Sequence, residues 1–262
     1  MSASIQSEAM AASPVALKAA KKELRSLMKK KLSNISSEST NAQSTIIFKN
    51  VISFKPYQQA KRVGIYLSMP TGEVQTDEIV RHALESGKQV FVPFLHKARD
   101  PPPDTPRSVM DMVDLTSLSD YESLERDSWG IPTIDAATVE KREHILQGSM
   151  KESRPLDMIL VPGVAFDIDP KSGYVRRLGH GKGFYDYFLH RYVQSRGSQI
   201  RETTSPGTDV LLCGLALREQ FLATETGFSV PVGDHDNLLH SLVVGDGKVL
   251  EGPIRELNSE DR

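Results

Sequence analysis

Short apolar segments that alternate with helical patterns restrict the folds open to this chain. Residues 62–68, 89–93, 156–161 and 210–217 are apolar runs of strand length, and residues 76–86 between the first two have helical spacing. Strand–helix–strand alternation predicts a parallel sheet with right-handed crossovers and helices on both faces. Ligands of such sheets bind beyond the carboxyl ends of the strands. We therefore expect a three-layer α/β fold with a mostly parallel central sheet.

A helix is expected over residues 14–32. Ser13 suits the N-cap and Pro14 the first turn, and an apolar stripe follows them. Lys21 and Arg25 lie one turn apart on one edge of this stripe. Such a basic pair is most often simply solvated, so the residues alone assign it no function.

Further elements are expected along the chain. They are a helix, an edge strand, a charged helix with its linker, a short helix and a strand, over residues 37–54, 110–115, 136–154, 217–221 and 242–244. Residues 167–174 are expected to form a turn-rich insertion, and polar insertions are expected near 96–108 and 195–209. Together these elements predict a single domain over residues 14–250. The segments outside it are expected to be a disordered N-terminus and a flexible tail, residues 1–13 and 251–262.

Composition excludes several classes of function. The chain has 262 residues and a formal net charge of −2, which gives no general affinity for nucleic acid or anionic membranes. Its one cysteine, Cys213, cannot form an intrachain disulfide and is expected to be a buried small apolar residue. No apolar run is long enough to span a bilayer, and residues 1–13 have no signal-peptide or arginine-rich presequence pattern. We expect a monomeric cytoplasmic protein without nucleic-acid or membrane partners.

One segment has glycine at every second position: Gly179, Gly181 and Gly183. An aromatic-rich helical pattern follows at once, over residues 184–192. A glycine-rich turn that opens a helix directs N–H groups and the positive end of the helix dipole at one point, which favours phosphate. Arg176, Arg177 and Lys182 would add positive charge. The pattern matches neither the P-loop nor the dinucleotide fingerprint, so an ordinary tight loop is the alternative.

A longer motif includes this segment. Residues 161–167, then Gly173, then residues 177–186 resemble the signature of the 5-formyltetrahydrofolate cyclo-ligases, also called methenyltetrahydrofolate synthetases. The similarity extends from about Lys21 to about Val244. It implies an α/β scaffold similar to that of sugar-phosphate isomerases and CoA-transferases.

The resemblance implies a ligase of folate and one-carbon metabolism. Such an enzyme converts 5-formyltetrahydrofolate (folinic acid) and MgATP to 5,10-methenyltetrahydrofolate, ADP and phosphate. A formamide carbonyl is a poor electrophile, and phosphoryl transfer to its oxygen would create an iminium phosphate that the ring-closing amine attacks. The protein's tasks would be positioning and charge neutralisation. A preference for polyglutamated folate stays open.

The resemblance also implies the site residues. The expected catalytic residues are Lys182, Arg177 and Tyr185. The expected ATP-binding residues are Lys21, Arg25, Arg177, Leu178, Gly179, His180, Gly181, Lys182, Gly183, Phe184 and Tyr185. The expected folate-binding residues are Met69, Glu73, Trp129, Phe184 and Tyr185. The expected Mg²⁺ ligands are Asp186 and Asp236, since Mg²⁺ prefers oxygen and often combines one or two carboxylates with phosphates.

The chain departs from the family pattern at two of these positions. Phe184 replaces a frequent tyrosine, so that only stacking is implied there. His240 aligns with a family acid, and a histidine is a poor ligand for Mg²⁺.

Three alternatives stay open. The chain could be a catalytically altered family member that binds nucleotide or folate. It could be a sugar-phosphate isomerase or thioester transferase on a similar scaffold, since fold alone does not separate these activities. Residues 234–236, with His240, could form a transition-metal site, although solvated loop acids are the commoner explanation of such a cluster.

Overall fold

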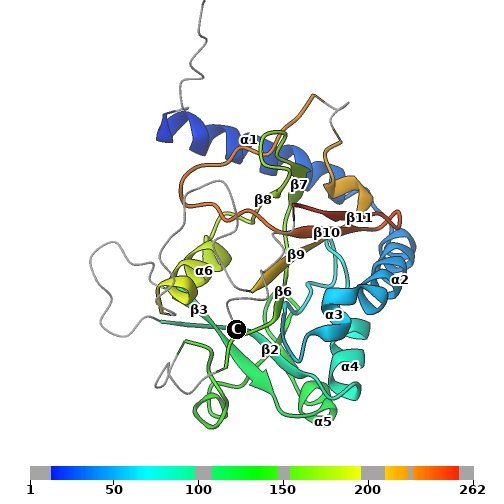
Figure 1. Cartoon of the computed structure of the whole chain (residues 1–262), viewed down its shortest axis with the longest axis vertical. Coiled ribbons are helices and arrows are strands. Elements are labelled where there is room, and N and C mark those ends of the chain that lie inside the picture. Colours follow the sequence, from blue (N-terminus) through cyan, green and yellow to red (C-terminus); the bar gives the residue numbers. More distant parts are fainter. Residues whose placement is uncertain (1–12, 98–107, 147–153, 196–209, 224–226, 254–262) are drawn as a thin grey trace, which may run out of the picture.

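A seven-stranded sheet forms the centre of the computed structural model, which describes residues 13–97, 108–146, 154–195, 210–223 and 227–253 (Figure 1). The strand order is β11-β10-β9-β6-β1-β2-β3. The five inner strands are parallel, and β3 and β11 pair antiparallel at the two edges. The strands are β1 Arg62–Ile65, β2 Gln89–Lys97, β3 Ser108–Leu115, β6 Met158–Val161, β9 Leu211–Ala216, β10 Ser241–Val244 and β11 Val249–Glu251. The prediction of a mostly parallel α/β sheet is confirmed.

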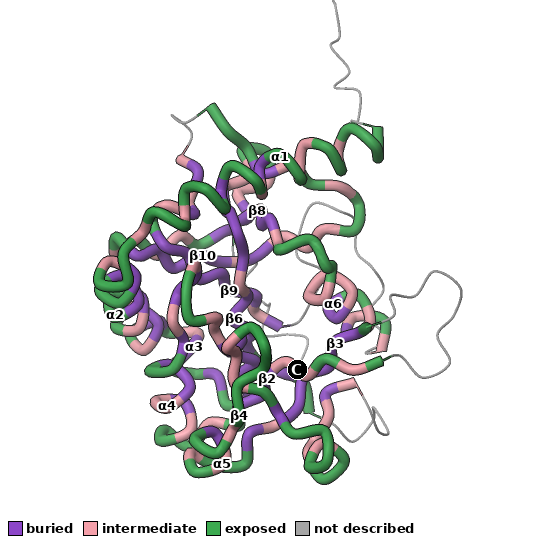
Figure 2. The backbone as a smooth tube through the Cα atoms, turned by 180° about the vertical axis from the view of Figure 1, so that it is seen from behind, coloured by how far each residue is buried: buried purple, intermediate pink, exposed green. Residues whose placement is uncertain are grey.

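Helices cover both faces of this sheet (Figures 1 and 2). On one face, α2, α3, α4 and α5 pack against the sheet in a single apolar cluster. On the other face, α6 and a two-stranded hairpin bury a second cluster, which includes Phe188 and Phe166. These elements are α2 Ser37–Ser53, α3 Lys55–Gln59, α4 Asp77–Glu85, α5 Leu118–Glu122 and α6 Phe184–Ser195, with the hairpin strands β7 Ala165–Ile168 and β8 Val175–Leu178.

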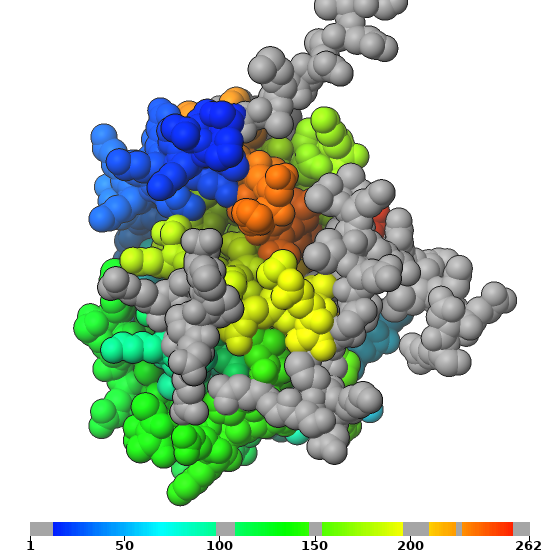
Figure 3. All heavy atoms as spheres, turned by 90° about the vertical axis from the view of Figure 1, so that its left-hand side faces the viewer, coloured from blue at the N-terminus to red at the C-terminus, as the bar shows by residue number. Residues whose placement is uncertain are grey.

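The first helix, α1 Pro14–Leu32, lies apart from the two main layers (Figure 1). The side chain of Ser13 caps its N-terminus by accepting a hydrogen bond from the Ala16 N–H at 3.3 Å. Its buried residues Leu24 and Met28 pack against the hairpin and against Val230 in a third cluster. The space-filling view shows α1 in blue beside the orange segment of the 230s (Figure 3). The helix therefore joins the C-terminal part of the fold.

Two expected elements differ from the structure. Residues 136–146 hold only the 3₁₀ turn η1 Val139–Lys141 and no α-helix, and residues 147–153 lie outside the described part. The charged side chains that suggested a helix instead fix an extended segment, because Arg142 donates to both carboxylate oxygens of Asp120 and the Glu143 N–H donates to Asp114. Residues 167–174 are also not a separate insertion, because they include the end of β7 and the turn of the β7–β8 hairpin.

Other boundaries were closer to expectation. The short helix near residues 217–221 is the 3₁₀ turn η2 Arg218–Gln220, and two strands of two residues each, β4 Glu125–Arg126 and β5 Pro132–Thr133, were not predicted. The two polar insertions lie almost wholly outside the described residues, as does most of each predicted terminal segment, although Glu251 belongs to β11. Within the described ranges, no helix has the length and apolar character needed to cross a membrane.

Candidate functional site

The glycine loop, residues 179–183, connects β8 to the N-terminus of α6. Gly181 and Gly183 have φ of +96° and +71°, a conformation that residues with a side chain rarely adopt. At Gly179 the restriction is space, because an added Cβ would lie 2.9 Å from Arg177 Nη1. The loop thus needs glycine for its conformation and for the close approach of an arginine.

Arg25 and Arg177 hold the loop from two directions. Arg25 Nε donates to the Gly179 carbonyl at 2.8 Å, and an added Cβ at Gly181 would lie 3.2 Å from Arg25 Cζ. Arg177 Nη1 donates to the Pro162 carbonyl at 3.1 Å, and its Nη2 donates to Asp186 at 2.8 Å. The buried Nε of Arg177 has no hydrogen-bond partner among the described residues. An unpaired buried cationic donor is costly, which is consistent with a place for an anionic ligand.

A second loop closes this group from the C-terminal part of the chain. Asp236 pairs with Lys21 of α1 at 2.5 Å and accepts the Gly233 N–H at 2.6 Å. The N–H of Asn237 donates to Asp186 at 3.4 Å. Four segments that are distant in sequence therefore meet: α1, the glycine loop, the first turn of α6, and residues 233–237.

The cations of this group outnumber its carboxylates. Burial lowers the pKa of Arg25, Asp236 and Asp186 raise it, and Arg177 lowers it. The pKa of His180 is lowered by desolvation and by the positive charges of Arg177 and Arg25. Near neutral pH His180 is therefore a weak candidate for holding phosphate charge.

Lys182 and Phe184 differ in their surroundings. Lys182 is exposed and forms no ion pair with the described residues, so that its ammonium group is free to meet a ligand. Phe184 is half-buried and packs against the second apolar cluster, at the start of α6.

The two predicted Mg²⁺ ligands both interact electrostatically with Arg25, and each forms an ion pair with a different cation. Asp186 pairs with Arg177, and Asp236 pairs with Lys21. Among the described residues, no group of three or more His, Cys, Asp or Glu side chains could hold a metal ion. Two carboxylates suit Mg²⁺ that arrives with phosphate oxygens, and they do not suit a transition metal held by protein ligands alone.

His240 lies outside this group. Its Nδ1 accepts the Leu212 N–H at 3.0 Å, and its ring meets Tyr174 edge-on. Burial lowers the pKa of His240 to about 4. A neutral histidine that accepts a backbone N–H is a structural residue, so the transition-metal alternative at residues 234–236 and His240 has no support.

Of the predicted folate residues, Tyr185 lies next to Arg177. The Arg177 Cζ atom is 5.8 Å from the centre of the Tyr185 ring. The hydroxyl of Tyr185 is buried and has no hydrogen-bond partner in the described part of the chain. Glu73 interacts electrostatically with both Tyr185 and Tyr66, and one of its carboxylate oxygens accepts the Met69 N–H at 2.5 Å. Burial raises the pKa of Glu73 to about 7.

Trp129 is not a core residue, although a lone tryptophan usually is. Its side chain is 70% exposed on the turn between β4 and β5. This turn packs against the loop of Met69, because an added Cβ at Gly130 would lie 2.6 Å from Pro70 Cγ. Met69 and Trp129 are sixty residues apart in sequence, but their loops are in contact. Trp129 is therefore available at the edge of the Met69–Glu73 loop.

Two expected residues point elsewhere. The Leu178 side chain is buried against α1, and its carbonyl accepts the Val164 N–H, so it can offer a ligand little. Arg176 was expected to add charge to the glycine loop, but it forms a two-hydrogen-bond pair with buried Asp167. The reason is that Arg176 and Arg177 are neighbours in β8, and successive side chains of a strand point to opposite faces.

Sequence reasoning also missed supporting residues. Asp167 accepts the Val230 N–H at 2.9 Å and so anchors the loop that carries Asp236. Tyr66, at the end of the first strand run, adjoins Glu73. Asp167 lies within the motif of residues 161–167. An acidic residue in a motif that has no assigned ligand can be predicted to anchor a neighbouring segment, and this signal could have identified Asp167.

Comparisons with known proteins identify the family to which this chain belongs. Residues 17–245 match the model of the 5-formyltetrahydrofolate cyclo-ligase family. A Caenorhabditis elegans "Probable 5-formyltetrahydrofolate cyclo-ligase" is 35% identical over 87% of this chain and 94% of that protein. A Mus musculus 5-formyltetrahydrofolate cyclo-ligase is 32% identical over 88% and 97%, respectively.

Two further relatives bear on fold and location. The fold resembles that of Aquifex aeolicus 5,10-methenyltetrahydrofolate synthetase, with a TM-score of 0.58 and 23% identity over 92% of this chain and 99% of that chain. An Arabidopsis thaliana relative, 28% identical over 87% of this chain and 75% of that protein, is named as mitochondrial. The family match spans nearly all of the described fold and contains every segment of the site. The chain belongs to the 5-formyltetrahydrofolate cyclo-ligase family.

Proposed function

We propose that the protein is an ATP-dependent ligase that cyclises 5-formyltetrahydrofolate to 5,10-methenyltetrahydrofolate, with release of ADP and phosphate. The observation that carries this proposal is the convergence of Arg25, Arg177 and the glycine loop, with a buried arginine donor left unpaired. A helix N-terminus with nearby cations favours a phosphate group. The Glu73–Tyr185 side of the same arginine then offers a partly apolar surface for a pterin.

The proposed chemistry proceeds through a phosphorylated formyl group. The formyl oxygen attacks the γ-phosphorus, ADP leaves, and the substrate becomes an iminium phosphate. The ring-closing amine then attacks the formyl carbon, and phosphate leaves with the former formyl oxygen. Arg25, Arg177 and Lys182 neutralise the phosphate charge, and Lys21 does so once Asp236 releases it. Tyr185 and Phe184 border the pterin, and Trp129 and Met69 lie at its outer edge.

The acids of the site fit a divalent cation that accompanies ATP. Asp186 and Asp236 supply carboxylate oxygens near Arg25, and Mg²⁺ is commonly bound through one or two carboxylates plus phosphates. Mg²⁺ would neutralise charge on the β- and γ-phosphates. The chain's own contribution is to hold Asp186 on the first turn of α6 and Asp236 on the anchored loop.

The direct test is the near-ultraviolet absorbance of methenyltetrahydrofolate. Purified protein is mixed with 5-formyltetrahydrofolate and Mg²⁺, with and without ATP. We expect an absorbance rise that requires ATP and is matched by the release of one ADP for each product molecule. A folded protein that binds ATP but gives no absorbance rise would instead be a catalytically altered family member.

Location and assembly are part of the same proposal. We expect a monomer in the cytoplasm, and sedimentation and cell fractionation test these two points. A mitochondrial pool would be recognised in the same fractions.

A further inference from the structure

Glu73 is a buried carboxyl group without a cationic partner. Its side chain lies in the loop after β1, the residue is 5% exposed, and it forms no ion pair within the described ranges. One oxygen, Oε1, accepts the Met69 N–H at 2.5 Å, and Oε2 accepts no hydrogen bond from the described residues. Buried carboxylates are normally paired with a cation, so a buried carboxyl group without an ion-pair partner requires an explanation.

The groups that face Glu73 leave it able to hold a proton. The titratable side chains that interact with it are Tyr66 and Tyr185. Tyr66 donates its hydroxyl proton to the Val74 carbonyl at 3.1 Å, whereas the Tyr185 hydroxyl is buried without a partner. One polar group of this region, the Tyr185 hydroxyl of α6, is thus left buried and unsatisfied among the described residues, and it interacts electrostatically with Glu73. Unsatisfied groups of this kind in a native structure are typical of a ligand or catalytic site.

The proposed reaction needs a proton acceptor. During ring closure, the lone pair of the attacking amine forms the second C–N bond, and the C–O bond to phosphate breaks with its electron pair leaving on phosphate. The nitrogen that attacked must lose its N–H proton for the product to become the delocalised methenyl cation. The cationic cluster around the phosphates cannot take that proton, because its arginines and lysines are already protonated.

We propose that the Glu73 carboxylate accepts the amine proton during ring closure. The proposal rests on the proposed function, because it assigns a step of that reaction. Glu73 interacts electrostatically with Tyr185, whose ring centre lies 5.8 Å from Arg177 Cζ. A group without an ion-pair partner changes its protonation state without breaking a salt bridge, unlike Asp186 or Asp236.

The acidity of Glu73 is consistent with this role. Burial raises the pKa of Glu73 to about 7, and the Met69 N–H opposes this shift. A proton acceptor works best when its pKa lies near the working pH. The deprotonated form is required, so kcat is expected to rise with pH through a value near 7 and to level off above it.

The competing explanation is that Glu73 only binds a polar edge of the pterin. The two roles differ in which kinetic constant they change. A binding residue affects the KM for the folate, whereas a proton acceptor affects kcat and the pH profile. The Glu73→Gln variant keeps an oxygen that can accept the Met69 N–H, and Glu78→Gln, at an exposed position in α4, is the matched control.

The experiment measures kcat, the folate KM and the ADP yield for the unsubstituted enzyme and both variants between pH 5.5 and about 8.5, a range chosen around the pKa of about 7. For Glu73→Gln we expect kcat to fall by about 10²- to 10⁴-fold, with KM changed by less than about threefold. ADP is expected to form in excess of methenyltetrahydrofolate, because phosphorylation precedes the blocked step. Glu78→Gln should behave as the unsubstituted enzyme does.

Several results would overturn the proposal. They are a kcat for Glu73→Gln within about threefold of the unsubstituted enzyme, a loss confined to KM, or a kcat of the unsubstituted enzyme that does not titrate between pH 6 and 8. The pH profile needs no variant, so a Glu73→Gln protein that fails to fold leaves the test intact. Failure of the proposed function itself looks different, because the unsubstituted protein would then give no ATP-dependent product at any pH.

Discussion

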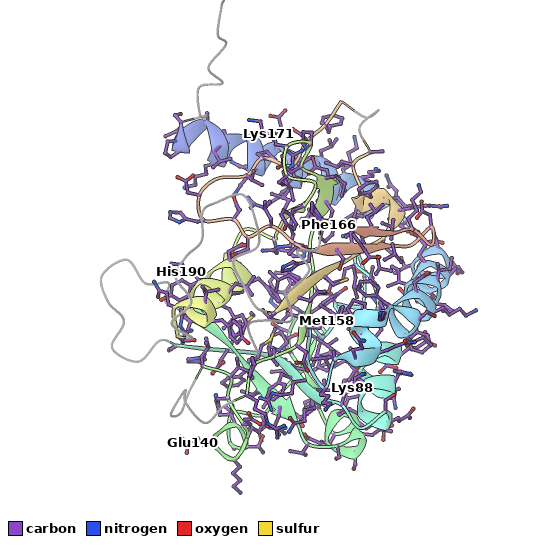
Figure 4. The ribbon with its side chains drawn as sticks, viewed as in Figure 1. Lys88, Glu140, Met158, Phe166, Lys171 and His190 are labelled. Carbon is purple, nitrogen blue, oxygen red and sulfur yellow. The ribbon has the colours of Figure 1, made fainter. Side chains whose placement is uncertain are left out.

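Lys182 is the most exposed of the cations near the glycine loop, which makes it the cleanest single-residue test of phosphate binding. Lys182→Ala is expected to abolish ATP turnover and to leave the melting temperature unchanged, because the side chain pairs with none of the described residues. The matched control is Lys171→Ala, an exposed lysine in the turn of the β7–β8 hairpin (Figure 4). Full ATP turnover in Lys182→Ala would contradict the assignment of this lysine to the phosphates.

His240 predicts a pH dependence of stability that is independent of catalysis. Its folded-state pKa of about 4 lies below its ordinary value of 6.5, because burial disfavours the charged ring. The contribution of His240 to the free energy of unfolding is therefore greatest above pH 6.5. It falls by up to about 3 kcal/mol as the pH drops to about 4, and it is constant below that pH. His240→Asn retains an acceptor for the Leu212 N–H and should remove much of this slope in urea titrations. His190→Asn, at an exposed position of α6, should not.

At the scale of residues, the sequence predicted which side chains gather but not how they pair. Lys21, Arg25, Arg177, Asp186 and Asp236 do come together in the structure. Their pairing could not be predicted, since Lys21 and Asp236 are 215 residues apart and only the complete fold brings them within 2.6 Å. Arg176 and Arg177 have different roles because they are neighbours in strand β8. This strand was not predicted, since the sequence around it was interpreted only as a glycine-rich loop.

At the scale of elements, the β7–β8 hairpin positions both halves of the proposed phosphate site. Its strand β8 carries Arg177, and Asp167 of β7 holds Arg176 and the Val230 N–H. Asp167→Asn is expected to cost about 1–3 kcal/mol of unfolding free energy, because a buried charged acceptor is lost while its donors stay buried. Asp169→Asn, which changes a more exposed acid 3.7 Å from the same arginine, should cost less than about 1 kcal/mol. Equal losses in urea denaturation would contradict the anchoring role of Asp167.

Elements with strong periodicity were predicted well, and those determined by tertiary contacts were not. The helix over residues 14–32 and its Ser13 cap were correct, as were the central strands. The segment that follows residue 136 failed as a helix because its charges bond to Asp114 and Asp120, neighbours that no local pattern specifies. Edge strand β11 was missed because three residues give too little periodicity.

At the scale of the whole molecule, the Lys21–Asp236 pair links the two ends of the described fold across the site. In the free protein, Asp236 forms an ion pair with Lys21, the lysine that is proposed to bind the ATP phosphates. Without a divalent metal, the Asp236→Asn variant is therefore expected to bind ATP about two- to fivefold more tightly. This factor corresponds to the free energy of one partly exposed ion pair, which ATP binding would no longer have to break. With Mg²⁺ present, the same variant should bind ATP more weakly than the unsubstituted protein.

Calorimetric titrations with EDTA and with Mg²⁺ measure both effects. Asp234→Asn, at an exposed neighbouring position, is the matched control and should leave both affinities unchanged. Weaker ATP binding by Asp236→Asn under both conditions would show that the aspartate does not compete for Lys21.

The packing of α1 also has a consequence for how the chain is made. The buried residues of this helix, Leu24 and Met28, share an apolar cluster with side chains from residue 164 onward. Its Lys21 can form its ion pair only after Asp236 has been synthesised. At about 5–20 residues per second, a ribosome needs roughly 10–40 s to reach that aspartate after making the helix. During this interval Leu24 and Met28 lack part of the cluster in which they are buried in the finished protein. Nascent chains are therefore expected to gain nucleotide affinity only at the end of synthesis, and the amphipathic helix is the segment that a chaperone would meet first.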